Sequence, residues 1–137
     1  MNRHRSMAFY VECLLLTVFL LALTAVLAQL FSAARAQALE ARRLTDAQRL
    51  AQNVSEEFYA AENEAEFLRL AGLEMETADD SGGQVERTGP SGESYRLDLE
   101  LTEQPQTAGR TVTLHVEVFA SNGAAVCGLD FVRYWPN

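Results

Sequence analysis

Glycine and proline are absent from Met1 to Ala71, and the chain contains no lysine at all. Glycine and proline are the residues that most often interrupt or end a helix. Their absence over this stretch therefore permits one very long helix. The only two cysteines are Cys13, in an apolar run, and Cys127, near the other end of the chain. Their different surroundings exclude a disulfide framework.

Positive charge is scarce. Eleven basic residues, all arginine, stand against nineteen acids, so the net charge is −8 at pH 7. The acids concentrate between Glu56 and Glu103. An acidic surface repels the phosphate backbone of nucleic acids and the headgroups of anionic lipids. We therefore expect no nucleic-acid partner for this part of the chain.

Residues that carry chemistry are few as well. The only histidines are His4 and His115, and neither has a neighbouring nucleophile or a set of metal ligands in the sequence. The segment Asp79-Asp80-Ser81-Gly82-Gly83 indicates a turn, because it lacks the ligand spacing of a calcium-binding EF-hand loop. The sequence predicts no catalytic residues, no metal site, no cofactor and no small-molecule substrate.

The most informative feature that is present is the apolar run from Ala8 to Phe31, which contains one charged residue, Glu12, at its start. As a helix this run extends about 36 Å, enough to cross a hydrocarbon core of about 30 Å. It predicts a single transmembrane helix over 8–31. A lone carboxylate at the start of such a helix is costly and is usually retained for function.

A cleaved secretory signal is a competing interpretation. Arg3 and Arg5 form a basic start, and Ala34-Arg35-Ala36 matches a small-x-small cleavage pattern. The apolar stretch is longer than the usual signal core of about 7–15 residues, however, and no helix breaker precedes the cut. We favour retention in the membrane over a secreted domain released after Ala36.

The orientation in the membrane is not decided by charge, because the arginines before the span are nearly balanced by those after it. A short hydrophilic leader is easier to leave in the cytoplasm than a folded acidic domain. We therefore expect a cytoplasmic N-terminus and an extracytoplasmic head.

The segment Met7-Ala8-Phe9-Tyr10-Val11-Glu12, followed by an apolar helix and preceded by the basic leader 1–7, resembles the processing and assembly segment of type IV prepilins and pseudopilins. In that family a phenylalanine stands beside the cleavage site and a glutamate follows shortly afterwards. The resemblance implies a bacterial cell membrane protein whose leader is removed by a prepilin peptidase, which also methylates the new amine. It implies further that Glu12 neutralises the amine of a neighbouring pilin-like subunit, in agreement with the cost of an unpaired charge in lipid.

The family normally has glycine before the cut, and here the residue is Met7 or Ala8. Cleavage after Met7 makes Ala8 the first residue and keeps Glu12 in the family's usual register. Cleavage after Ala8 retains a small residue before the cut and makes Phe9 the first residue, but shifts Glu12 by one. Both alternatives remain open.

Beyond the membrane, residues 32–62 are expected to continue the helix in amphipathic form. The apolar positions recur at threes and fours: Leu39, Ala47, Leu50, Val54, Phe58 and Ala61. The opposite face, expected to be solvated, carries Glu40, Arg42, Asp46, Arg49, Glu56 and Glu57.

The remaining residues, 63–137, predict a small acidic head. Asn63 is a candidate N-cap of a short helix, with Glu66 in the capping-box position and Gly72 as its stop. Strands are expected at an edge segment 85–87 and over 95–101, 112–118 and 125–134, with a loop containing Pro105 and Gly109 and a hairpin turn at Asn122-Gly123. His115 is expected to face solvent and pair with a carboxylate across strands, and Tyr134 and Trp135 to close the end of the core.

These expectations combine into a pilin-like α+β fold, in which a long N-terminal helix packs on an antiparallel sheet of three to four strands. The predicted function is a minor pilin or pseudopilin subunit of a type IV pilus, secretion or competence filament. The alternative is an unprocessed single-pass envelope scaffold that acts through helix–helix interaction.

Overall fold

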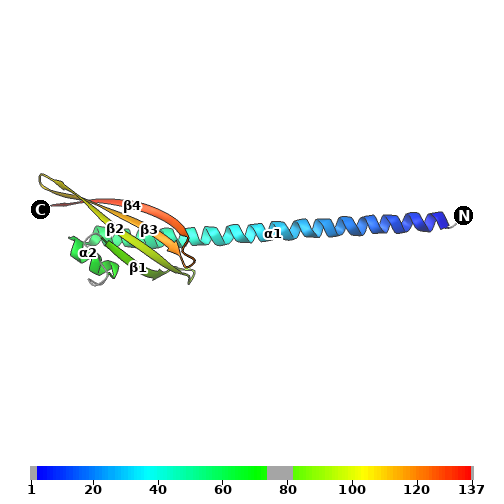
Figure 1. Cartoon of the computed structure of the whole chain (residues 1–137), viewed down its shortest axis with the longest axis horizontal. Coiled ribbons are helices and arrows are strands. Elements are labelled where there is room, and N and C mark those ends of the chain that lie inside the picture. The colour runs from blue at the N-terminus through cyan, green and yellow to red at the C-terminus, as the bar shows by residue number, and fades with distance from the viewer. Residues whose placement is uncertain (1–2, 74–81, 137) are drawn as a thin grey trace. The chain divides into compact units, whose positions relative to one another are not determined.

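The structure is a computed structural model that describes residues 3–73 and 82–136, with side chains from Met7 onward. The elements are labelled in Figure 1; in chain order they are α1 (Arg3–Ala60), α2 (Glu64–Ala71), β1 (Gly82–Thr88), β2 (Ser94–Gln106), β3 (Gly109–Ala120) and β4 (Ala125–Pro136). The chain divides after Glu40 into two compact units, which are described separately. The predicted α+β arrangement of a long helix and an antiparallel sheet is confirmed.

Helix α1 is continuous over 58 residues, in agreement with the absence of glycine and proline. Within the first unit every side chain described, from Met7 to Glu40, is exposed. This part of the helix is long and apolar enough to cross a membrane, with a mean hydropathy of 2.5 in its most apolar window. The hydroxyls of Thr17 and Thr24 donate to the carbonyls four residues earlier, at 2.8 Å each, so neither needs water as a partner.

Helix α2 has the predicted ends. Asn63 Oδ1 accepts a hydrogen bond from the Glu66 amide at 3.0 Å, and Gly72 adopts the left-handed conformation at φ 80° that favours glycine. The Glu66 carboxylate accepts from the Glu62 amide at 2.8 Å rather than from that of Asn63. The bend between α1 and α2 is thus fixed by local hydrogen bonds.

The four strands form one sheet in the order β1-β2-β3-β4, with every neighbouring pair antiparallel. They are longer than predicted. Gly82 and Gly83, expected in a turn, begin β1, while the expected Asp79 and Asp80 lie outside the described residues. The hairpin turn at Asn122-Gly123 is confirmed, with the Gly123 amide donating to the Ala120 carbonyl at 2.8 Å.

The predicted loop containing Pro105 and Gly109 is wrong, because β2 continues to Gln106 and β3 starts at Gly109. The Gly89 amide donates to the Glu93 carbonyl at 2.8 Å, so Glu93 directs its backbone groups toward β1. Because this direction alternates along a strand, the odd-numbered residues of β2, including Pro105, also direct their backbone groups to the β1 side. Strand β1 begins at Gly82, opposite Glu100, so no β1 residue stands beside Pro105. A proline there breaks no hydrogen bond of the sheet.

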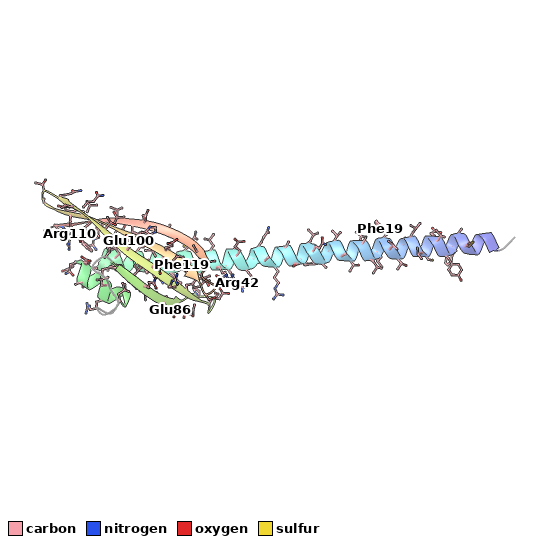
Figure 2. All side chains as sticks on the ribbon, viewed as in Figure 1. Phe19, Arg42, Glu86, Glu100, Arg110 and Phe119 are labelled. Atoms are coloured by element: carbon pink, nitrogen blue, oxygen red, sulfur yellow. The ribbon has the colours of Figure 1, made fainter. Side chains whose placement is uncertain are left out.

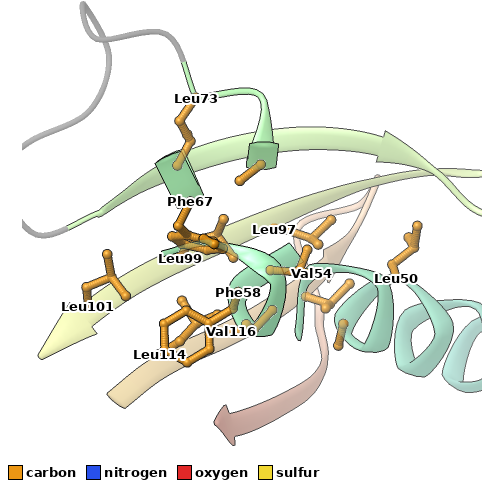
Figure 3. Packing of buried hydrophobic residues seen from close by; sticks show 14 of the residues in the cluster. Leu50, Val54, Phe58, Phe67, Leu73, Leu97, Leu99, Leu101, Leu114 and Val116 are labelled. Carbon is orange, nitrogen blue, oxygen red and sulfur yellow. The ribbon is translucent and has the colours of Figure 1, made fainter. Parts of the chain in front are cut away.

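The core lies between the sheet and the second half of α1 (Figure 3). The alternating residues of β2 and β3 meet the apolar stripe of the helix, and both sets are buried: Ala47, Leu50, Ala51, Val54, Phe58, Ala61, Leu97, Leu99, Leu101, Val112, Leu114, Val116 and Val118. Leu39, which continues the same stripe in the sequence, is 46% exposed. The part of the stripe that packs on the sheet therefore begins at Ala47.

Candidate functional site

The residues singled out for processing and assembly lie near the start of α1, and all of them are exposed. Met7 and Phe9 retain 69% and 64% of their accessible surface. At 3.6 residues per turn, Ala8 and Phe9 precede Glu12 by four and three residues and share its helix face, whereas Met7 does not. Both candidate first residues therefore lie within about one turn of the carboxylate.

Glu12 is surrounded by apolar side chains. Its neighbours Val11, Leu15 and Leu16 are 57%, 63% and 63% exposed, and Figure 2 shows Phe19 projecting from the helix further along the same segment. Among the side chains that the structure describes, Glu12 has no hydrogen-bond or ion-pair partner. A carboxylate placed in hydrocarbon needs a cation to offset its desolvation. This position can therefore bind a positively charged group from another molecule.

The second half of α1 carries a polar cluster that holds it to the β1–β2 turn. Asp46 Oδ2 accepts from the Ser91 hydroxyl and amide, and the Tyr95 hydroxyl lies 3.4 Å from the same oxygen. The prediction that Asp46 is solvated is wrong, since the residue is only 5% exposed. It lies beside Ala47 at the edge of the apolar stripe, and the turn folds over it.

Two further members extend this cluster. Arg43 Nε donates to Glu93 Oε2 at 3.1 Å, and the Tyr95 hydroxyl donates to the same carboxylate oxygen at 3.2 Å. Burial, followed by the charges of Asp46 and Glu93, raises the pKa of Tyr95 to about 12. The cluster thus fixes which face of α1 meets the sheet.

A second polar contact joins α1 to β1 and α2. Arg87 donates from both terminal nitrogens to the Glu57 carboxylate, at 2.9 and 2.7 Å, and also to the Ala71 carbonyl at 3.0 Å. Glu57 was expected on the solvated face but is half-buried by this pair, whereas Glu40, Arg42, Arg49 and Glu56 are exposed as predicted. A bidentate pair of this kind positions as well as stabilises.

The C-terminal end of α1 is capped by an arginine from the far end of the chain. Arg133 Nη1 donates to the carbonyls of Phe58 and Tyr59 at 2.8 and 2.6 Å, and also to that of Ala61. A cation at this end of a helix is favourable because the unsatisfied carbonyls carry partial negative charge. Sequence reasoning missed this role, since nothing local to Arg133 indicates it.

Two expectations for the head are confirmed. His115 is exposed and its Nδ1 contacts Asp130, its register partner on β4. The hydrogen bond to Asp130 raises the pKa of His115. Trp135 is 3% exposed and packs on Phe58 at 5.6 Å between ring centroids, so it closes one end of the core. The expectation that Tyr134 does the same is wrong, because Tyr134 is 45% exposed and alternates to the opposite face of β4.

The described residues hold no group of three or more His, Cys, Asp or Glu side chains arranged to bind a metal ion. Both cysteines are free thiols, and burial raises the pKa of Cys127. Comparison with known proteins finds no family profile, no curated protein and no solved structure that matches this chain. The chemistry of the site is therefore argued from its own residues.

Proposed function

We propose that this chain is a membrane-anchored pilin-like subunit that assembles into a filament through its N-terminal helix. The observation that carries the proposal is Glu12, a carboxylate with no partner among the described side chains, in an exposed apolar helix and one turn after the two candidate first residues. A free amine at Ala8 or Phe9 of a neighbouring subunit supplies the cation that this carboxylate needs. The N-terminal sequence resemblance and the helix-on-sheet fold both support this function.

In this function the chain performs no chemistry of its own. Membrane lipid surrounds 8–31 before assembly, and neighbouring apolar helices replace that lipid in the filament. A prepilin peptidase removes the leader 1–7 or 1–8 on the cytoplasmic side of a bacterial membrane, and the acidic head faces the other side. The helix from Ala47 to its end at Ala60 is committed to the sheet of its own subunit, so assembly relies on the exposed first unit.

The test is the intact mass and the N-terminal residue of the protein extracted from membranes of a cell that has a prepilin peptidase. We expect a chain that begins at Ala8 or Phe9 and carries one added methyl group. Glycine variants locate the cut: Met7→Gly accelerates cleavage after residue 7, and Ala8→Gly accelerates cleavage after residue 8. A chain that still begins at Met1 overturns processing and favours the static scaffold, and one that begins at Gln37 indicates a secreted domain.

Assembly is tested separately by oxidative cross-linking through the native Cys13, in a Cys127→Ala background that leaves one thiol. Cys13 directly follows Glu12, so cross-linked dimers report helix association at this depth. Glu12→Gln keeps the shape of the side chain and removes its charge, and we expect it to abolish cross-linking while processing continues. Glu40→Gln, an exposed carboxylate outside the apolar run, is the matched control. Equal cross-linking in both variants refutes the role of Glu12.

A scaffold function remains the second candidate because of two leucines beyond the predicted span. Leu39 and Leu44 are 46% and 42% exposed on α1. Exposed leucines on a helix outside lipid suit packing against a partner helix. Alanine at both positions weakens partner binding in a scaffold, and leaves Cys13 cross-linking unchanged in a filament subunit.

A further inference from the structure

The sheet has two edges, β1 and β4, and the β4 edge is unusually open to pairing. Strand β4 has 12 residues and, among the described strands, pairs only with β3. Soluble proteins usually protect an edge with lysine, with an internal proline or by keeping the strand short. Strand β4 has no lysine, and its one proline is its last residue, Pro136.

Apolar surface concentrates at this edge. Leu129, Val132 and Tyr134 are 39%, 55% and 45% exposed, and Tyr59 of α1, whose hydroxyl reaches the Val132 carbonyl, is 48% exposed. The only other large apolar side chains exposed among the described residues of the second unit are Leu44 and Leu70. The β4 edge is therefore the principal apolar surface of this unit.

Both charged side chains of β4 have a partner within the subunit, although the protein as a whole carries −8. Asp130 contacts His115, and Arg133 is bound to the carbonyls at the end of α1. Asp130 remains an exposed carboxylate, so a second carboxylate beside it is unfavourable. Two acidic heads repel one another over most of their surface, so an edge whose charges are paired is where they approach at least electrostatic cost.

The Val132 carbonyl shows which backbone groups of β4 face outward. It accepts a hydrogen bond from the Tyr59 hydroxyl at 3.2 Å, so it points away from β3. In an antiparallel strand, alternate residues direct both backbone groups to the same side. Asp130, Val132 and Tyr134 thus present their backbone groups outward. A strand that pairs with this edge donates a backbone amide to the Val132 carbonyl and replaces the hydroxyl of the exposed Tyr59 as its donor.

Strand direction selects the partner. Helix α1 meets the sheet first where β2 begins, through Asp46 and Tyr95, and last where β4 ends, through Phe58 and Trp135. Strands β2 and β4 therefore run in the same direction as α1, while β1 and β3 run in the opposite direction. In two copies whose α1 helices point the same way, β1 of one copy is antiparallel to β4 of the next. Antiparallel pairing of two β4 edges requires opposed helices.

We propose that β4 of one subunit pairs with β1 of the next subunit, so that the sheets of neighbouring heads become continuous. This inference rests on the proposed function, which orients all subunits alike. Pairing of unlike edges is open-ended and repeats along an assembly, as a filament requires. The partner is a second copy of this chain.

The register follows from the side chains. In β1 the outward backbone groups belong to Gln84, Glu86 and Thr88, because the Gly89 amide and the odd-numbered residues face β2. Setting Glu86 opposite Asp130 places like charges together, which is unfavourable. Setting Glu86 opposite Val132 instead places Gln84 opposite Tyr134 and Thr88 opposite Asp130. This register places a β1 residue beside each of the two exposed apolar side chains of the outer face.

The inference is tested with two differently tagged copies that both carry Cys13→Ala and Cys127→Ala, one with Val132→Cys and the other with Glu86→Cys. Opposed residues in an antiparallel pair have Cα atoms about 5.5 Å apart, within the range for a disulfide. We expect a mixed disulfide dimer on oxidation of the membranes. The matched control replaces Glu86→Cys with Glu100→Cys, an exposed position on the central strand β2 (Figure 2), and yields no dimer.

The remaining outcomes overturn the inference. If Val132→Cys cross-links to itself and not to Glu86→Cys, the heads pair through two β4 edges with opposed helices. If the mixed product is missing although the Cys127→Ala chain, tested separately, still forms the Cys13 dimer, the helices assemble and the heads do not pair, which refutes the inference and leaves the proposed function intact. If neither product forms, the proposed function fails and the inference with it. Unfolding of either variant is detected by the fluorescence of Trp135.

Discussion

The stability of the head should depend on Phe58 more than on any neighbouring exposed residue of α1. Its side chain is fully buried, and its ring lies 5.4 Å from that of Phe67 and 5.6 Å from that of Trp135. Truncation to alanine in a core costs about 3–5 kcal/mol, as transfer free energy and as a cavity. A unit of about 100 residues has a total stability of about 5–15 kcal/mol. Phe58→Ala therefore removes about a fifth of the stability or more.

The assay is thermal unfolding of the full chain in detergent, followed by the fluorescence of Trp135, the only tryptophan. For a domain of this size each kcal/mol shifts the midpoint by about 4–8 °C, so Phe58→Ala lowers it by about 12 °C or more. Leu44→Ala, on the same helix but 42% exposed, is the control. Its expected cost is about 0.5 kcal/mol. Equal shifts in the two variants would refute the assignment of α1 to the core of the head.

Three further results are expected. Arg133→Met leaves the carbonyls at the end of α1 without their cation and lowers the free energy of unfolding by about 1.5–3 kcal/mol, while Arg69→Met, whose side chain is 77% exposed, has little effect in the same denaturant titration. The raised pKa of His115 means that its ion pair with Asp130 is fully formed below about pH 6.5 and is lost as pH rises through the folded-state pKa. NMR titration of Asp130→Asn should show a lower pKa for His115 than in the unmodified chain. The pKa of Tyr95, about 12, lies above the ordinary value of 10.0, so ultraviolet titration should show one tyrosine that ionises at higher pH than the others. The head should begin to lose stability above about pH 10, because the unfolded chain releases the Tyr95 proton there and the folded chain does not. Ionisation of all four tyrosines together would contradict the buried Asp46–Tyr95 contact.

The sequence was sufficient for the elements whose signals are local. The absence of helix breakers predicted α1, the Asn63 and Gly72 caps predicted α2, and the two-residue alternation around Leu97 and Val116 predicted the central strands. In each case the residues that specify the element lie within it. The exposure of Met7 to Phe31 follows in the same way from composition alone.

The contacts that join the elements were not predictable from local pattern. Asp46 falls on the polar side of a helical projection, yet it is buried because the Gly89–Glu93 turn, more than forty residues later, folds over it. Arg133 caps a helix that ends more than seventy residues earlier. Both depend on how the sheet is placed on α1, which a periodicity does not specify.

Because Glu12 and the contacts of the head lie in different parts of the chain, loss of assembly can be distinguished from loss of stability. Every described contact that holds the head together begins at Arg43 or later, and Glu12 takes part in none of them. Glu12→Gln should therefore leave the unfolding midpoint reported by Trp135 unchanged, because distant sites without shared partners act independently. Loss of Cys13 cross-linking in that variant then reports a lost charge in the apolar helix, and a destabilised head is excluded as its cause. Conversely, Phe58→Ala destabilises the head without altering any residue of the processing segment, so its N-terminus after processing should be that of the unmodified chain.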